Sequence, residues 1–302
     1  MTERNKVLLD EIVIKPLSYK DSIDLINAGY PYSRAKLRRS QLENFFEVVR
    51  FPRRETRLVA YLKKRNRAIG SLSLVMHTKE LYSIKYVFSD PKFRQRGIAT
   101  KLVKYSLTLA RNRGAKKVFL TPEPLGAASR IYQKLGFRSI SEDFIVSGAG
   151  KTFNLQSFKR RNLLRPQSSS KGNRAILFSI YKSSLSQDFI DFFDIDKCNF
   201  INGYSQDFKR FFLKRVYIND SANSLALVFN RPLTHMAFAE LYSQSDSFFP
   251  DMIRMLNVIL YKKGINYLTI NVFNVKTKAI FNLLELEQFY PYQSIFMGLS
   301  LS

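Results

Sequence analysis

The sequence predicts a mixed α/β protein of two domains, and three observations lead to this fold class. The chain has 302 residues, which suits two domains of roughly 100–200 residues each. Stretches that alternate apolar and polar residues, as strands do, are interleaved with stretches of helical periodicity. The second half also repeats the element order of the first half. We expect a first domain at residues 1–150, a linker at 151–172 and a second domain at 173–302.

Each element expected in the first domain has a local reason in the sequence. The expected strands, from their alternation, cover residues 7–17, 56–62, 68–77, 81–88, 117–121 and 137–146. The expected helices, from their periodicity, cover residues 18–28, 33–49, 98–112 and 127–135. Gly114 and Gly136 end the last two helices, since glycine adopts the left-handed backbone that closes a helix.

A repeat supports the expectation of a second domain with the same fold. A helix ending at Gly264 matches the one ending at Gly114, at an offset of 150 residues. Phe289 corresponds to Phe137 at an offset of 152 residues. A strand at 267–272 lies between the matched points. Duplication of one fold explains this order. The alternative is that any two segments with this element order would align equally well.

The net charge of +25 is concentrated in the first part of the chain. Residues 1–150 hold 30 basic and 13 acidic residues (+17), residues 151–172 hold 6 and none (+6), and residues 173–302 hold 13 and 11 (+2). Such a field favours polyanionic partners: a nucleotide cofactor, an acidic acceptor or a nucleic acid. The linker is either a flexible tether or a basic segment that grips a polyanion.

Several classes of protein are disfavoured by the composition. Cys198 is the only cysteine, so no internal disulfide can form, and a reducing cytoplasmic setting is expected. Two histidines and one cysteine give no metal-site spacing, so no metal is expected. No apolar run reaches the ~20 residues of a membrane span, and the first residues lack the apolar core of a signal peptide.

The segment from Val87 to Thr100 carries the clearest chemical signal. A strand ends, a tight loop follows and a helix begins, so backbone N–H groups at the helix N-terminus form an anion cradle. Gly97 lets the backbone approach an oxygen closely because it has no side chain. The residues expected to bind a pyrophosphate are Arg94, Gln95, Arg96, Gly97, Ile98, Ala99 and Thr100.

Two motifs in this part of the chain resemble the GNAT superfamily of N-acetyltransferases over residues ~10–150. Arg94, Gly97 and Ala99 fit the signature Arg/Gln-x-x-Gly-x-Gly/Ala. The run from Ala128 to Phe137 is similar to the second family motif, Ala-x-x-x-Tyr-x-x-x-Gly-Phe. The resemblance implies a GNAT fold in the first domain and a degenerate GNAT-like fold in the second.

The resemblance also implies a mechanism with acetyl-CoA as co-substrate. The pantetheine arm would lie along main-chain groups of Val87, Phe88 and Ser89, and a primary amine would attack the thioester directly. Tyr132 would protonate the departing thiolate, since a phenol of pKa ~10 is protonated at neutral pH. The alternative for Tyr132 is a core aromatic residue. The amine would belong to a protein N-terminus, a lysine or a small molecule.

The first domain departs from the family pattern at two positions. Leu125 stands where many relatives have an asparagine seven residues before the tyrosine, and Ser83 stands where some have a catalytic glutamate. Glu80 and Glu123 are nearby in sequence without a reason to prefer either as the base, and His77 is expected to be an ordinary strand residue. Water or backbone carbonyls would then relay the proton.

The remaining expectations concern partners. The stretch Arg34–Arg67 holds 12 basic and 3 acidic residues and is either a solvated face or a site for an acidic acceptor, particle or nucleic acid. The second domain lacks both motifs, so it would serve packing, homodimerisation or acceptor binding. A non-catalytic module that binds CoA or nucleic acid with the same fold is the competing hypothesis for the whole protein.

Overall fold

The chain divides into two compact units, and its described strands follow one another in a single sheet order. In this computed structural model the described residues are 12–17, 55–63, 67–122, 126–149, 164–167, 173–195, 213–219, 224–231, 236–243, 245, 248–264, 267–273 and 290–301. Unit 1 comprises Met1–Arg138 with Met297–Ser302, and unit 2 comprises Ser139–Phe296. The mixed α/β fold class predicted from the sequence is confirmed.

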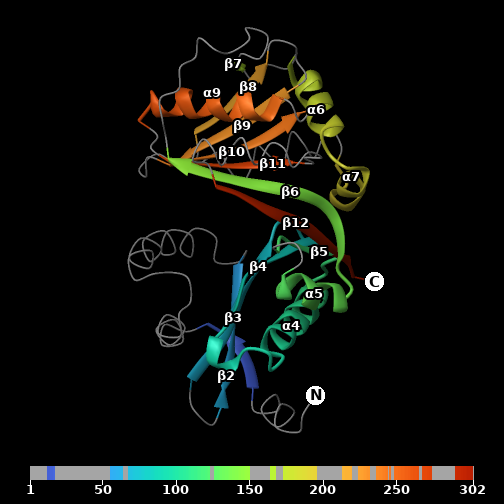
Figure 1. The fold of residues 1–302 in the computed structure, drawn as a ribbon. Helices are drawn as coiled ribbons and strands as arrows, with labels where there is room; N and C mark the ends of the chain where they lie inside the picture. Colours follow the sequence, from blue (N-terminus) through green and yellow to red (C-terminus); the bar gives the residue numbers. More distant parts are fainter. Residues whose placement is uncertain are drawn as a thin grey trace. The chain divides into compact units, whose positions relative to one another are not determined.

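Unit 1 is a mixed sheet with helices packed against it (Figure 1). Its strands are β1 (Ile12–Pro16), β2 (Glu55–Leu62), β3 (Arg67–Met76), β4 (Leu81–Ser89) and β5 (Lys117–Leu120). They lie in sequence order, antiparallel from β1 to β4, with β5 parallel to β4. The parallel step needs a crossover, and α4 (Ile98–Asn112) provides it.

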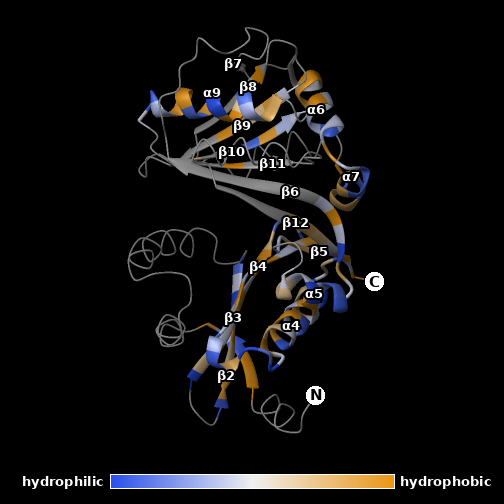
Figure 2. Ribbon diagram, in the orientation of Figure 1, coloured by the Kyte–Doolittle hydropathy of each residue, from blue (hydrophilic) through white to orange (hydrophobic). Residues whose placement is uncertain are grey.

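The expected helix at residues 98–112 is confirmed as α4 with the same bounds. Leu102, Val103 and Ala110 are fully buried on its sheet-facing side. Polar and apolar residues separate along the helix (Figure 2). Gly114 follows with φ +84°, in the left-handed region that ends a helix. The second expected helix is α5 (Ala127–Lys134).

The last strand of the chain completes the sheet of unit 1. β12 runs over Tyr290–Ser300, and its residues Met297–Ser300 pair antiparallel with Leu120–Lys117 of β5. Met297 is fully buried. Local sequence patterns do not report such a pairing, because its partners are about 180 residues apart in the chain.

Unit 2 has the same arrangement of two antiparallel strands followed by a helix and a parallel strand. Its strands are β6 (Arg138–Ala149), β7 (Leu164–Gln167), β8 (Leu213–Asn219), β9 (Ser224–Arg231), β10 (Met236–Ser243) and β11 (Tyr267–Phe273). Their order is β6-β11-β10-β9-β8-β7, with β10 and β11 parallel. The crossover is α9 (Phe249–Tyr261), and Gly264 follows it with φ +76°. The predicted repeat of helix, glycine and strand is therefore present.

Two further helices of unit 2 contribute to a second cluster of buried residues. They are α6 (Asn173–Ser183) and α7 (Gln187–Phe193). Tyr181 packs edge-on against Tyr242 with ring centroids 4.8 Å apart, and Phe189 packs against Phe296 at 5.2 Å. The Ser186 side chain caps α7 by accepting from the Phe189 N–H at 3.3 Å.

The structure differs from the expected domain boundaries in two places. β6 was expected at the end of the first domain, but it pairs with β11 and belongs to unit 2. Residues 164–167, expected in the linker, form β7 and pair with β8. Pro166 is accommodated there because β7 is the outermost strand in its order, where a missing N–H removes no necessary ladder bond. The helices expected at 18–28 and 33–49 lie outside the described residues.

None of the helices in the described ranges has the length and apolar character needed to cross a bilayer.

We predict that Met297→Ala destabilises unit 1, although residue 297 lies far from that unit in sequence. Removing a buried methionine costs about 2–5 kcal/mol. Urea unfolding, with hydrogen exchange followed at the β5 amides, measures the loss. Ser300→Ala, at an exposed position of the same strand, is the control, expected within about 0.5 kcal/mol of wild type. Unchanged protection of β5 in Met297→Ala would contradict the pairing.

Candidate active site

The candidate site is the place where β4 and β5 part. The described ladder between them holds three pairs, Leu81–Ser83 against Lys117–Phe119. β4 then continues for six residues, Ile84–Ser89, beyond its last pair with β5. The described ladder thus ends at Ser83, and the two strands part beyond it.

A β-bulge reshapes β4 within this diverging segment. Ser71 pairs with Phe88 and Ser73 with Lys85, so two β4 residues, Tyr86 and Val87, stand opposite a single β3 residue. Tyr86 has φ +55°, an uncommon conformation for a non-glycine residue, and its side chain is exposed. Such bulges are frequent next to active sites, where they redirect a strand.

The N-terminus of α4 lies directly after the diverging segment. The first N–H bonded within the helix is that of Lys101, which donates to the Gly97 carbonyl at 2.9 Å. The N–H groups of Ile98, Ala99 and Thr100 precede it and have no partner within the helix. Gly97 is the N-cap residue with φ +76°, and Gln95 also has a positive φ of +62°. These two left-handed residues turn the chain tightly at the helix end.

The loop before α4 presents positive charge to solvent. Arg94, Gln95 and Arg96 are exposed, whereas Ile98 is buried. The Arg96 guanidinium lies 5.6 Å from the centre of the buried Phe93 ring. Within the described part of the chain neither arginine forms an ion pair with a carboxylate. The helix dipole and the two exposed arginines together give this end of α4 a positive potential, which favours an anion.

Asp90 fixes the start of this loop. Its buried carboxylate accepts the Lys92 N–H at 2.9 Å and the Arg67 guanidinium at 2.8 Å. Its own N–H donates to the Ile69 carbonyl on β3 at 2.8 Å. The loop is thus tied to the sheet at its first residue, which holds the anion site in place relative to β4.

Gly70 on β3 sets the distance between α4 and the sheet. A methyl group at this position would lie 2.8 Å from Ile98 Cγ2 and 2.9 Å from the Phe88 carbonyl oxygen. Both distances are shorter than real contacts. Only glycine lets the first turn of α4 lie this close to the diverging part of β4.

Tyr132 lies on α5 and is buried, with 6% of its surface exposed. Its ring packs edge-on against Phe137 at 6.0 Å between centroids. Burial raises the pKa of the Tyr132 phenol to about 12, because the phenolate form would lose its hydration. The side chain therefore stays protonated at neutral pH, a condition that both the general-acid role and the core-aromatic role satisfy.

The structure places the candidate proton acceptors named from the sequence in different environments. His77 Nε2 lies 2.8 Å from the fully buried Ser83 Oγ, and its ring packs on Phe119 at 5.2 Å. Glu80 forms an exposed ion pair with Lys116 at 2.6 Å, outside the gap between the strands. Glu123, like Leu125, lies outside the described residues.

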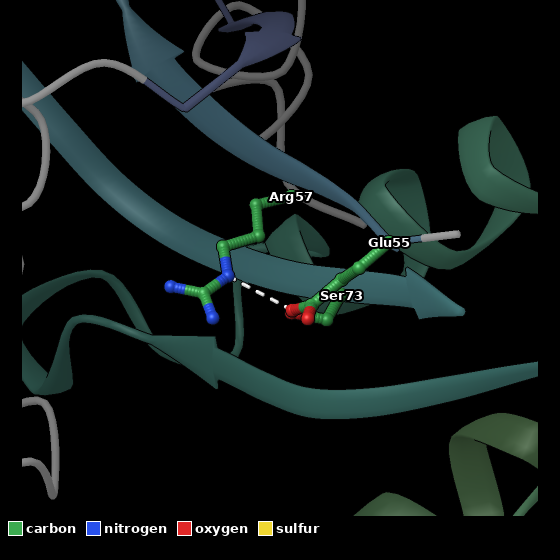
Figure 3. A network of polar contacts seen from close by, with 3 residues as sticks. All are labelled: Glu55, Arg57 and Ser73. Carbon is green, nitrogen blue, oxygen red and sulfur yellow. Dashed lines mark hydrogen bonds and ion pairs between the residues drawn. The ribbon is translucent and has the colours of Figure 1, made fainter. Parts of the chain in front are cut away.

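A polar sheet face is a feature that the sequence analysis missed. Gly70 faces α4, so Ser71 and Ser73, which alternate with the residues toward α4, lie on the opposite face. Ser73 Oγ donates to Glu55 Oε1 at 2.8 Å, and Arg57 Nε donates to the same oxygen at 2.8 Å (Figure 3). The signal was present in the expected strand 68–77, where Ser71 and Ser73 stand two positions apart among apolar residues.

Unit 2 lacks the features that define the site in unit 1. β10 and β11 pair over six positions, Met236–Leu241 against Tyr267–Val272, so these strands do not part early. α9 begins at a fully buried Phe249, and its first turn carries the acidic Asp251. A phosphate at this helix end would meet a buried ring and a carboxylate instead of open N–H groups.

Other expectations fall partly or wholly beyond the described ranges. The basic stretch Arg34–Arg67 is described only from residue 55 to 63 and at 67, so its role as an acidic-partner or nucleic-acid surface stays a prediction. Within the ranges that are described, no group of three His, Cys, Asp or Glu side chains could hold a metal ion.

Comparison with known proteins identifies the first part of the chain. Residues 22–137 match the model of the Acetyltransferase (GNAT) family. This stretch contains the diverging strands, the α4 loop and Tyr132, so the resemblance predicted from the two motifs is confirmed. No curated protein sequence matches the chain.

Solved structures resemble the chain over nearly its full length. A GCN5-related N-acetyltransferase from Sphaerobacter thermophilus aligns at 11% identity over 96% of this chain and 96% of its own, with a TM-score of 0.57. A protein from Pyrococcus horikoshii assigned as an acetyltransferase aligns at 15% identity over 97% of this chain and 90% of its own, with a TM-score of 0.55. At these identities the likeness shows the fold.

We predict that Gly70→Ala destabilises the protein by about 1–3 kcal/mol, because the Phe88 carbonyl is backbone and cannot yield to a methyl group. Thermal and urea unfolding measure the change. Gly114→Ala is the control: it meets no atom within 4 Å and is strained only by its φ of +84°. Hydrogen exchange at the Lys101 amide, the first that is bonded within α4, should accelerate in Gly70→Ala and not in Gly114→Ala. Equal exchange in both variants would contradict the role of Gly70.

Proposed function

We propose, from the match of residues 22–137 to the GNAT acetyltransferase family, that this protein transfers an acetyl group from acetyl-CoA to a primary amine. The observation that carries the proposal is the early parting of β4 and β5 beside the open N-terminus of α4. An extended pantetheine arm fits a strand edge, and a diphosphate fits a helix N-terminus.

Main-chain groups of β4 would align the pantetheine arm. The Asp90 N–H points toward β3, where it bonds to the Ile69 carbonyl. Successive N–H groups along a strand point to opposite sides, so the N–H of Ser89 points toward the gap. By the same alternation the N–H of Val87, directly after the bulge, faces the gap and can donate to the thioester oxygen as charge develops there.

The diphosphate of CoA would lie on the loop that precedes α4. The N–H groups of Ile98, Ala99 and Thr100 are directed at it, and the exposed Arg94 and Arg96 supply charge. Gly97 allows the phosphate oxygens to approach the backbone because no side chain intervenes. Gln95 belongs to the same turn, where its positive φ helps direct the neighbouring amides outward.

The reaction needs no acyl-enzyme. The nitrogen lone pair of the amine attacks the thioester carbonyl, the C–S bond breaks, and the CoA thiolate leaves. Tyr132 would transfer its phenolic proton to that thiolate, and the proton that the nitrogen loses as the amide forms would restore the phenol. Because its pKa is about 12, the phenol remains a proton donor throughout the neutral range.

We predict that the protein binds one CoA per chain and that Gly97→Glu lowers this affinity at least about 100-fold. A carboxylate there repels the diphosphate, and a side chain is strained at φ +76°. Isothermal calorimetry at low salt measures both quantities. Gly114→Glu is a matched control, because it places the same side chain at φ +84° at the other end of α4. A stoichiometry of two would contradict the assignment of unit 2.

We predict that Tyr132→Phe lowers kcat for thiol release from acetyl-CoA about 100-fold or more, with its KM for acetyl-CoA nearly unchanged. The phenol ionises only near pH 12, so the wild-type rate should show no decline from this group below pH ~11. A full rate in Tyr132→Phe would mean that the residue is a core aromatic. CoA binding without turnover on any amine would instead support the non-catalytic module.

A further inference from the structure

The polar sheet face of unit 1 combines buried hydroxyl residues with buried apolar residues such as Val59 and Phe88. Three rows of residues cross β2, β3 and β4 on the side away from α4. They are Glu55–Val75–Ser83, Arg57–Ser73–Lys85 and Val59–Ser71–Phe88. On the α4 side the alternating β3 residues Leu72 and Leu74 are apolar and buried. The buried hydroxyls on the opposite face therefore need polar partners.

One of those hydroxyls has no partner. Ser71 is only 6% exposed, and its Oγ forms no hydrogen bond in the described part of the chain. Its register partner on β4 is Phe88, inside the segment that diverges from β5. Neighbouring strands are about 4.8 Å apart, so this hydroxyl lies one strand away from the proposed thioester site.

Glu55 lies on the same face, and one of its carboxylate oxygens can accept a further hydrogen bond. Both contacts of its carboxylate, from Ser73 and Arg57, go to Oε1 (Figure 3). Oε2 makes no contact among the described residues, and the side chain is 27% exposed. The carboxylate is held in one orientation by two donors, which is how a positioned proton acceptor is expected to be held.

We propose that Glu55 is the residue that receives the acceptor amine and takes its proton, with Ser71 as a second hydrogen-bonding group. The ligand class is a primary alkylamine, whose ammonium form carries three donors. One N–H bond breaks, its proton passes to Glu55 Oε2, and the electron pair stays on nitrogen for attack on the thioester. This assignment rests on the proposed function. It places the general base on β2, because Ser83 occupies the β4 position where some family members have a glutamate.

The charges around Glu55 fit this role. The charged or titratable groups on this face of β1 to β4 are Lys15, Arg57 and Lys85, together with His77, which contacts Ser83. The three cations disfavour a further positive charge nearby, which favours the neutral, nucleophilic amine after its proton has moved to the carboxylate.

The test compares Glu55→Gln, Glu55→Asp and Ser71→Ala with wild type in the full chain. The matched control is Glu80→Gln, which removes a carboxylate from an exposed ion pair of the same unit. Thiol release is measured with 1,4-diaminobutane and with a short peptide that has a free N-terminus, from pH 6 to 10. Calorimetry with CoA on each variant checks that the cofactor site is intact.

We expect Glu55→Gln to lower kcat/KM for the amine about 100-fold at pH 7, with the deficit shrinking at higher pH as more amine is already neutral. The α-amino group of the peptide, with a pKa near 8, should recover at lower pH than the diamine. Ser71→Ala should raise the KM for amine several-fold, and Glu55→Asp should retain intermediate activity. CoA affinity should stay within about twofold in all variants.

Two results would overturn the inference. One is a Glu55→Gln profile that matches Glu80→Gln at every pH. The other is a pH-independent loss accompanied by weaker CoA binding, which would show that the Glu55 network only supports the sheet. If wild type binds CoA but acetylates neither amine, the proposed function fails separately.

The amine site can also be judged without turnover. In CoA-saturated protein, 1,4-diaminobutane should shift the backbone amide resonances of Ser71 and Ser73, and Glu55→Gln should abolish the shifts. Unshifted amides in the wild-type protein would refute the site.

Discussion

The separation of β4 from β5 after three residue pairs is the constraint on which the site of unit 1 depends. A parallel ladder normally satisfies the backbone groups of both strands, and here the described ladder between β4 and β5 ends at Ser83, six residues before β4 itself ends. The bulge at Tyr86 and Val87 redirects that edge. Under the proposed function, a ligand with an extended amide chain lies where the ladder ends.

The helix that follows is held against this gap by contacts with little freedom. Gly70 permits an approach that any side chain would block, and Asp90 ties the loop to both Ile69 and Arg67. The N-terminus of α4 and the diverging part of β4 are thereby fixed relative to each other. Preorganisation of this kind matters because a ligand that bridges both sites gains affinity only if neither has to move.

The two units show how one topology can keep or lose such a site. Both contain an antiparallel pair, a crossover helix, a left-handed glycine and a parallel strand. In unit 2 the parallel strands stay paired over six positions, and Phe249 is buried at the start of the helix. In unit 2 the continued pairing of β10 with β11 occupies the strand edge that diverges in unit 1. The buried Phe249 ring lies at the start of α9. The fold alone therefore does not imply coenzyme binding.

The sequence by itself determined the local elements of the first part of the chain. Helical periodicity and Gly114 located α4 at residues 98–112, and the run from Arg94 to Thr100 indicated its anion site, because both properties depend on residues within a few positions of each other. Only the tertiary structure decided which strands pair. β6 joins β11, the end of β12 joins β5, and Glu55 meets Ser73 across 18 residues. Strand pairing depends on partners distant in the chain, and alternation within one strand shows which face a residue takes but not what lies opposite it.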